Sequence, residues 1–342
     1  MKFDKYFQLA IEKNASDIHL AGGERAALRI GGQLSFLEET VSPSEVASIV
    51  QELLTKPQLE RFERERELDM AYSMNGWRLR VNLHFHLGAM GLSARLVPSV
   101  IPDPASLGFT ETIHQLTKFM SGLVLVTGPS GSGKSTTLAA MIEIINNERA
   151  ARIITIEDPI EFIYKDKRSM TIQREVGVDT LTFADALKHV LRQDPNVILV
   201  GEMRDLETIQ AALTAAETGH LVLSTLHTQS AAATVERIID MFEGARQRQV
   251  LLQLAGSLRA VISQQLIPTL KGGLTAAREI MIPNPAIATL IREHKVAQIP
   301  SVIQTSVREG MITMEMAVKK LYESGVIGDE YVKRGRERGK TF

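Results

Sequence analysis

A glycine-rich segment at residues 128–135 reads Gly-Pro-Ser-Gly-Ser-Gly-Lys-Ser and fits the pattern G-x-x-x-x-G-K-[ST]. It follows a short apolar run and precedes a helical stretch. Glycines let backbone N–H groups turn inward around phosphate oxygens without a clash from a Cβ atom, and a helix beginning near Gly133 adds its positive end. The segment therefore predicts a strand, a phosphate-binding loop and a helix in succession, as in α/β nucleotide-binding folds.

The residue types in this loop indicate how it would hold ATP. Lys134 is expected to reach the β- and γ-phosphates, and the Ser135 hydroxyl is expected to bind Mg²⁺. The other expected nucleotide contacts are Gly128, Ser130, Gly131, Ser132, Gly133 and Thr136. The alternative is a Gly/Ser-rich turn without a ligand, in which case replacing Lys134 would leave nucleotide hydrolysis unchanged.

Four short apolar runs, separated by helical stretches, lie at residues 123–126, 153–156, 197–200 and 221–223. Runs that are apolar on both faces are typical of central strands in a parallel sheet covered by helices. From about Pro285 the chain is expected to be entirely helical. We therefore expect an ATPase core over 108–285, followed by a C-terminal helical subdomain and tail over 286–342.

The first hundred residues follow a different pattern. Residues 77–83 alternate polar and apolar side chains, as half-exposed antiparallel strands do, and so do residues 17–20. Residues 42–66 are typical of helices, and residues 1–20 are expected to form an amphipathic helix rather than a signal peptide. These patterns predict a separate domain that mixes helices with an antiparallel sheet.

Three prolines between residues 98 and 104 mark the change of pattern. Proline interrupts both helices and strand ladders, so this stretch predicts a flexible linker. The expected boundaries are an N-terminal domain at 1–98 and a linker at 99–107.

Composition narrows the class of protein. Hydrophobic residues make up 44% of the chain, the formal net charge is −1, and there is no cysteine, which excludes a disulfide scaffold and a Cys-ligated zinc site. No apolar run approaches the ~20 residues that a membrane-spanning helix needs. We therefore expect no membrane insertion and no direct nucleic-acid binding. The polar tail at 333–340 is expected to be a solvated terminus, the alternative being contact with nucleic acid or lipid.

Phosphoryl transfer also requires an acid that positions the metal and a group that orients water. Two acidic clusters follow predicted strands, at residues 157–161 and 201–205, where α/β sheets bind ligands. In the second cluster, Gly201 stands where a generic P-loop enzyme carries Asp, which leaves Glu202. Each acid has a structural alternative, and Asp205 is placed to cap the helical run at 206–217.

Histidines and arginines supply further candidates. His220 and His227 bracket the strand at 221–224, where an imidazole can donate to a phosphate or orient an acid; the alternative is a structural role. His84 and His86 alternate on one strand, but no acid or cysteine at ligand spacing supports a metal site there. Arg80 and Arg95, taken alone, fit a solvated strand face.

Taken in order, these segments resemble a known family. The glycine-rich loop and residues 155–162, 200–205 and 218–228 are similar to the Walker A, Asp box, Walker B and His box of the secretion-superfamily ATPases, which serve type II secretion and type IV pili. The glycine at 201 is that family's own form of Walker B. Segments similar to its pilus-retraction branch are 173–176, 211–220, 290–298 and 303–305. Extension and type II secretion members usually carry a four-cysteine zinc insertion, and this chain has no cysteine, which favours the retraction branch.

The resemblance implies a fold and a set of roles. The fold is α/β: a PAS-like N-terminal domain plus a RecA-like P-loop ATPase domain with a C-terminal helical subdomain. Glu161 is the expected catalytic glutamate that polarises the attacking water, and Glu202 is expected to support Mg²⁺, partly through water. His220 and His227 are expected near the γ-phosphate, and Arg80 and Arg95 are expected to contact nucleotide phosphates.

The resemblance also implies partners and a process. The expected assembly is a homohexamer that hydrolyses ATP to remove pilin from a type IV pilus, driving twitching motility. It would act through an inner-membrane platform protein, and a paralogous retraction ATPase is a further candidate partner. The expected location is cytoplasmic, at the inner-membrane surface beneath the pilus.

Two departures from the family and several alternatives stay open. The family's retraction-linked motif has Arg-Asn where this chain has Ala288 and Thr289, and Ser121 stands where many members carry Arg. The alternative functions are a motor for pilus extension, type II secretion or DNA uptake, and an accessory retraction ATPase with little turnover. A nucleic-acid translocase is a further alternative, which near-neutral charge disfavours.

Overall fold

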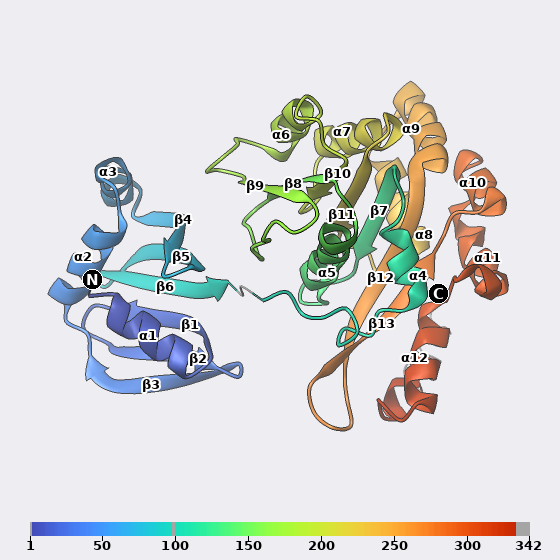
Figure 1. Ribbon diagram of the computed structural model, residues 1–342. Coiled ribbons are helices and arrows are strands. Elements are labelled where there is room, and N and C mark those ends of the chain that lie inside the picture. Colours follow the sequence, from blue (N-terminus) through green and yellow to red (C-terminus); the bar gives the residue numbers. More distant parts are fainter. Residues whose placement is uncertain (1, 98–99, 333–342) are drawn as a thin grey trace. The chain divides into compact units, whose positions relative to one another are not determined.

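The computed structural model describes residues 2–97 and 100–332. Two compact units divide the chain, one up to Val100 and one from Ile101 onward, with the segment Glu161–Ile163 grouped with the first. Figure 1 labels the elements of both units.

Within residues 2–97, a six-stranded antiparallel sheet has the order β3-β2-β1-β6-β5-β4. Three helices pack on one face of it and bury a core that includes Phe3, Phe7 and Phe62. The elements in chain order are α1 (Asp4–Glu12), β1 (Ala15–Ala21), β2 (Arg25–Ile30), β3 (Gln33–Thr40), α2 (Pro43–Leu53), α3 (Lys56–Glu65), β4 (Glu67–Met74), β5 (Trp77–His86) and β6 (Ala89–Val97). The expected strands at 17–20 and 77–83 and the helices at 42–66 are confirmed.

The expected helix over residues 1–20 is wrong beyond its first part. Helix α1 ends at Glu12, and Asn14 adopts the left-handed conformation (φ 51°) before β1 begins. From there the apolar period becomes two, with Ile18 and Leu20 buried in the core. Side chains at this spacing share one face of a strand, so sheet pairing prevails over a continued helix.

Within residues 100–332, a seven-stranded sheet has the order β13-β12-β7-β11-β10-β8-β9, in which only β13 is antiparallel to its neighbour. The four predicted apolar runs lie in β7, β8, β10 and β11, in the middle of this sheet. The elements are α4 (Glu111–Leu116), β7 (Gly122–Thr127), α5 (Lys134–Glu148), β8 (Arg152–Glu157), β9 (Met170–Glu175), α6 (Phe183–Val190), β10 (Val197–Val200), α7 (Leu206–Glu217), β11 (Leu221–Leu226), α8 (Ala231–Asp240), α9 (Gly244–Ser257), β12 (Leu258–Pro268) and β13 (Leu274–Met281).

From Pro285 the described chain is helical apart from one isolated bridge, in which Ile312 pairs with Ile280 of β13, so the prediction of a helical region is confirmed in its main part. Asn284 caps the first helix, since its Oδ1 accepts a hydrogen bond from Ile287 N at 3.1 Å. The elements are α10 (Pro285–Arg292), η1 (Val296–Gln298), α11 (Ile299–Thr305), η2 (Val307–Glu309) and α12 (Met314–Glu323). The polar tail at 333–340 lies outside the described residues. Among the described helices, none is long and apolar enough to cross a bilayer.

Candidate nucleotide site

The glycine-rich loop joins β7 to α5, as the sequence predicted. All six residues of β7 are buried, and α5 starts at Lys134 directly after Gly133, which adopts a left-handed conformation (φ 84°). At Gly128 (φ 146°) a Cβ atom would collide with the backbone oxygen of Gln264 on β12. Only glycine therefore suits these two positions, where the loop turns closely against the neighbouring strand.

Lys134 and Ser132 carry the polar groups inside the loop. The Lys134 ammonium donates to the carbonyl oxygens of Gly128 at 2.9 Å and Pro129 at 3.0 Å. The buried Ser132 hydroxyl has no hydrogen-bond partner among the residues that the structure describes. Since a buried polar group without a partner is costly, this hydroxyl suits a ligand that brings its own oxygens, such as a phosphate.

A cavity of about 260 Å³ opens beside the loop. Its walls are residues 129–132 of the loop together with Gln229, Gln265 and Leu266. Sequence analysis missed these last three, because they come from segments about 100 and 130 residues further along the chain. The cavity gives the loop a neighbouring space with polar amide groups on its wall.

Glu202 and His227 lie at the carboxyl ends of adjacent strands, β10 and β11. Glu202 Oε2 is 3.8 Å from His227 Nε2, and Glu202 Oε1 is 2.8 Å from Arg204 Nε. The Glu202 side chain is 19% exposed, so it is half-buried between its two partners. The structure thus joins an acid of the predicted Walker B segment to a histidine of the predicted His box.

His220 lies at the other end of β11 from His227. Its Nδ1 is 3.0 Å from the Ala215 carbonyl oxygen, and its own carbonyl accepts from Gly122 N, at the start of β7. The phosphate loop follows the far end of β7, and six residues of strand span about 20 Å. The structure therefore does not bring His220 to the phosphate loop of its own chain, because a strand separates the two ends of the His box.

The Asp box begins at Glu157, the last residue of β8. Glu157 is buried and accepts a hydrogen bond from Thr155 Oγ1 at 2.6 Å. The next residues turn through a cis Asp158–Pro159 peptide, and Ile160 N donates to Glu175 Oε2 at 3.1 Å. Glu161 is exposed and lies in the segment Glu161–Ile163.

Arg80 and Arg95 are direct cross-strand partners on β5 and β6, and both are exposed. Arg95 Nε donates to Asp17 Oδ1 on β1 at 2.7 Å, and Ser16 Oγ donates to Asp17 Oδ2 at 2.7 Å. Burial opposes ionisation of Asp17, but these hydrogen bonds prevail and lower the pKa of its carboxyl below the usual 3.8. Sequence analysis missed Asp17, although its place on the polar side of an alternating strand was visible.

The structural alternative for Asp205 is confirmed: its Oδ1 accepts from Thr208 N at 2.8 Å and caps α7.

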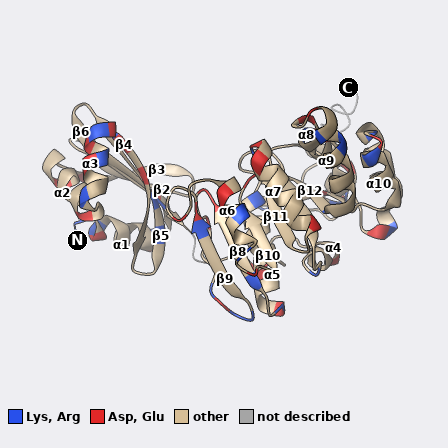
Figure 2. Cartoon of the chain, turned by 90° about the horizontal axis from the view of Figure 1, so that it is seen from above, with Lys and Arg blue, Asp and Glu red and all other residues tan. Residues whose placement is uncertain are grey.

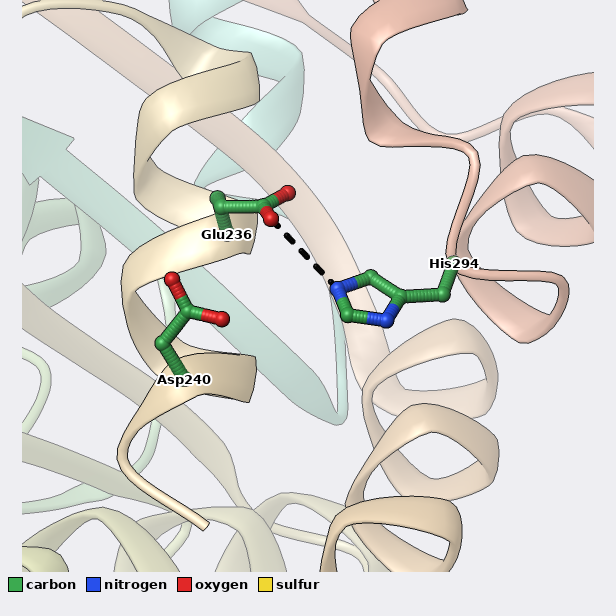
Figure 3. A group of neighbouring side chains, drawn as sticks. All are labelled: Glu236, Asp240 and His294. Atoms are coloured by element: carbon green, nitrogen blue, oxygen red, sulfur yellow. Dashed lines mark ion pairs between the residues drawn. The ribbon is translucent and has the colours of Figure 1, made fainter. Parts of the chain in front are cut away.

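Among the described residues, the His and carboxylate groups close enough to share a cation are Glu236, Asp240 and His294, on α8 and just after α10 (Figure 3). We interpret this partly exposed group as a structural contact that ties α8 to the segment following α10, since Glu236 Oε1 is 3.5 Å from His294 Nε2. Figure 2 shows basic and acidic residues interspersed over both units.

Comparison with known proteins agrees with this geometry. A family model described as Type II/IV secretion system protein matches residues 2–314. The chain is 44% identical to the type IV pilus retraction ATPase PilT of Pseudomonas aeruginosa over 99% of this chain and 98% of that protein. It is 46% identical to a twitching motility protein of Neisseria gonorrhoeae over 88% of this chain and 81% of that protein.

A solved structure of the pilus retraction motor PilT with bound ADP has a TM-score of 0.91 and 43% identity, over 96% of this chain and 95% of that chain. The expected α/β fold class and the expected resemblance are confirmed, and the protein is an ATPase that binds nucleotide. The chain belongs to the family of type II/IV secretion system ATPases, and its similarity to pilus retraction ATPases extends over both of its units.

Proposed function

We propose that this protein is the ATP-driven motor that retracts a type IV pilus and so powers twitching motility. One observation carries the proposal: 44% identity to a pilus retraction ATPase extends over 99% of the chain, so that both units are matched and not the phosphate loop alone. Homology confined to the loop would support nucleotide binding only, because the same loop serves many chemistries.

The phosphate loop and its neighbours suit ATP with Mg²⁺. Ser135 and Glu202 offer a hydroxyl and a carboxylate, the hard oxygen ligands that Mg²⁺ prefers, Glu202 partly through water. When bound, the ion neutralises charge on the β- and γ-phosphate oxygens. Lys134 then supplies a fixed positive charge from within the loop, and the buried Ser132 hydroxyl gains a partner.

We assign water activation to Glu161 and charge neutralisation to Arg80 and Arg95. A carboxylate that accepts a hydrogen bond from water makes its oxygen a better nucleophile toward the γ-phosphate. Guanidinium groups are suited to phosphate oxygens because they donate in a fixed fork. The Arg95–Asp17 ion pair holds one of these groups in place, since Asp17 is only 5% exposed while the Arg95 side chain is 61% exposed.

The assembly that we propose is a homohexamer on the cytoplasmic side of the inner membrane. Its partners are a membrane-embedded platform protein at the pilus base and, in some cells, a paralogous retraction ATPase. Hydrolysis drives relative motion of parts of the motor, in the manner of hinge closure around a ligand.

Deleting the gene tests the direction of the motor. Retraction predicts cells with abundant surface pili and no twitching, and complementation with the wild-type gene restores movement. Bald cells would overturn retraction and favour pilus extension. Normal pili with impaired protein export would favour type II secretion.

One sequence departure gives the extension or secretion alternative its specific support. Ala288 and Thr289 replace the Arg-Asn pair of the retraction-linked motif, and helix α10 forms without it. Ala288 packs against the core, and Thr289 Oγ1 accepts from Arg292 Nη2 at 2.9 Å. Restoring the pair with Ala288→Arg and Thr289→Asn leaves motility unchanged if the present pair already suffices for retraction.

A further inference from the structure

Two buried polar side chains lie beneath the phosphate loop, on strands far from it in sequence. Gln264 on β12 is 2% exposed, and Arg278 on β13 is 7% exposed. They are cross-strand partners in the antiparallel ladder, and Arg278 Nε donates to Gln264 Oε1 at 2.8 Å. Buried polar groups are retained where their hydrogen bonds are satisfied, so their partners identify what they hold.

Gln264 holds the loop. Its Nε2 donates to the carbonyl oxygen of Ser132 at 2.5 Å, and its Oε1 accepts from Thr137 Oγ1 on α5 at 2.8 Å. A Cβ atom at Gly133 would lie 2.9 Å from Gln264 Nε2, so this glycine also makes room for the amide. The amide orientation is determined chemically, because Arg278 can only donate and the Ser132 carbonyl can only accept.

Arg278 holds the other end of this network, the turn at residues 103–109. Its Nη1 donates to the carbonyl oxygens of Leu107 at 2.9 Å and Gly108 at 3.4 Å, and its guanidinium lies 5.3 Å from the Phe109 ring centroid. Burial lowers the pKa of Arg278 to about 10, and the oxygens that it reaches are neutral carbonyl and amide groups. Burying a charge among neutral partners is costly, which is unusual for a group that serves packing alone.

The turn is closed by its own hydrogen bonds and begins at the end of the proline-rich stretch at residues 98–104. Leu107 N donates to Asp103 O at 3.3 Å, Phe109 N donates to Pro104 O at 3.1 Å, and Ser106 Oγ donates to Asp103 O at 2.7 Å. The path from the loop through β12 and β13 to the segment before α4 can be followed in Figure 1.

We propose that Gln264 and Arg278 are positioning residues that shape the phosphate loop and couple its state to this turn. The Ser132 carbonyl, the Gln264 amide, the Arg278 guanidinium and the Leu107 carbonyl form one continuous chain of hydrogen bonds through the core. Since the two side chains are buried in packed surroundings, a movement of the loop backbone requires an adjustment at the turn. The coupling rests on nucleotide binding by the loop, as in the proposed function.

Hydrogen exchange of the wild-type full chain tests the coupling directly. ADP binding is expected to slow amide exchange in peptides covering residues 103–109 several-fold, although the nucleotide binds at the loop. Unchanged exchange at 103–109, with ADP bound and exchange slowed at the loop, would overturn the coupling. Absence of any ADP binding would instead overturn the proposed function.

Steady-state kinetics of Arg278→Lys test the positioning role. Lysine keeps the charge but cannot donate to Gln264 and to the turn in one planar fork. The KM for ATP is expected to rise about tenfold, equivalent to about 1.4 kcal/mol, with kcat changed much less. The ADP effect on residues 103–109 should also be lost. The matched control is Arg259→Lys on β12, because Arg259 Nη1 donates to the nearby Gly256 carbonyl at 2.8 Å and, among the described residues, to neither the phosphate loop nor the turn.

Gln264→Met provides a second variant in case Arg278→Lys does not fold. It removes the amide while keeping an unbranched side chain of similar length, and the same rise in KM is expected. Folding of each variant is checked by circular dichroism and its unfolding midpoint. A folded variant with wild-type KM and a wild-type ADP effect on exchange would show that the two residues serve packing only.

Discussion

The two sheets of this protein present their functional groups in different ways. In the parallel sheet, β7, β10 and β11 are buried throughout and carry no charged side chain, so Lys134, Glu202 and His227 lie beyond the strand ends. In the antiparallel sheet, buried and exposed positions alternate along β5, and Arg80 lies in mid-strand between buried Leu79 and Val81. Charged side chains therefore lie at the ends of these three parallel strands, whereas in the antiparallel sheet they lie along its exposed face.

This difference determines whether the residues concerned are neighbours in the sequence or come from separate strands. The phosphate loop is one contiguous segment, because it is the connection between a strand end and a helix. Arg80, Arg95 and Asp17 come from three strands and meet only through the register of the ladder. A motif thus reveals the phosphate loop, while the cluster of Arg80, Arg95 and Asp17 becomes visible only once the strands are paired.

The largest effect is expected at the edge of the parallel sheet. Lys134→Ala should reduce ATP turnover on the order of 10² to 10³-fold, because it removes a buried donor from the region of developing charge. Turnover of the purified chain is measured against Lys165→Ala, which removes an exposed lysine of the same unit. Equal turnover in the two variants would contradict the assignment of the loop.

An intermediate effect is expected at Asp205, where stability and turnover can be measured separately. Asp205→Ala should lower the free energy of unfolding by about 1 kcal/mol through loss of the α7 cap, and Asp205→Ser should restore most of it. Turnover per folded molecule should stay near wild type, measured alongside urea unfolding. A turnover loss in Asp205→Ser that matches Asp205→Ala would instead make the carboxylate part of the catalytic site.

The smallest effect is expected on the face of the antiparallel sheet. The lowered pKa of Asp17 means that its ion pair stabilises the fold above pH 3.8 and that this stability is lost as the pH falls below that value. Asp17→Asn should therefore lower the urea midpoint at neutral pH, with the difference from wild type shrinking in acid. The effect is modest because Arg95 is largely solvated. Trp77, the single tryptophan of the chain, reports unfolding of this unit by fluorescence. A difference independent of pH would contradict the ionic origin.

The sequence alone predicted those elements that are contiguous segments or that have a regular pattern of apolar residues. The loop with its strand and helix, the central strands and the helical C-terminal region all follow from local patterns. Strand β12 escaped prediction because Ser263, Gln264 and Gln265 interrupt its apolar run, and these polar groups serve the loop and its cavity.

Residues linked across strands escaped prediction for a related reason. Arg278 acts on a turn 170 residues earlier, and no local pattern carries that information. His220 shows a different limit, because its expected place near the γ-phosphate comes from the family resemblance, and in its own chain it lies at the other end of β11 from His227. Seven residues along an extended strand separate the two by more than the width of a nucleotide's phosphates.

The central proposal is that the exposed arginines Arg80 and Arg95 contribute to ATP hydrolysis. The direct test is ATP turnover by the full chain carrying Arg80→Ala and Arg95→Ala, with ADP affinity measured in parallel and Arg64→Ala on α3 as the surface control. We predict that turnover falls by about 10²-fold or more while ADP affinity changes little, since the arginines act on developing charge. Wild-type turnover in the double variant would contradict the claim.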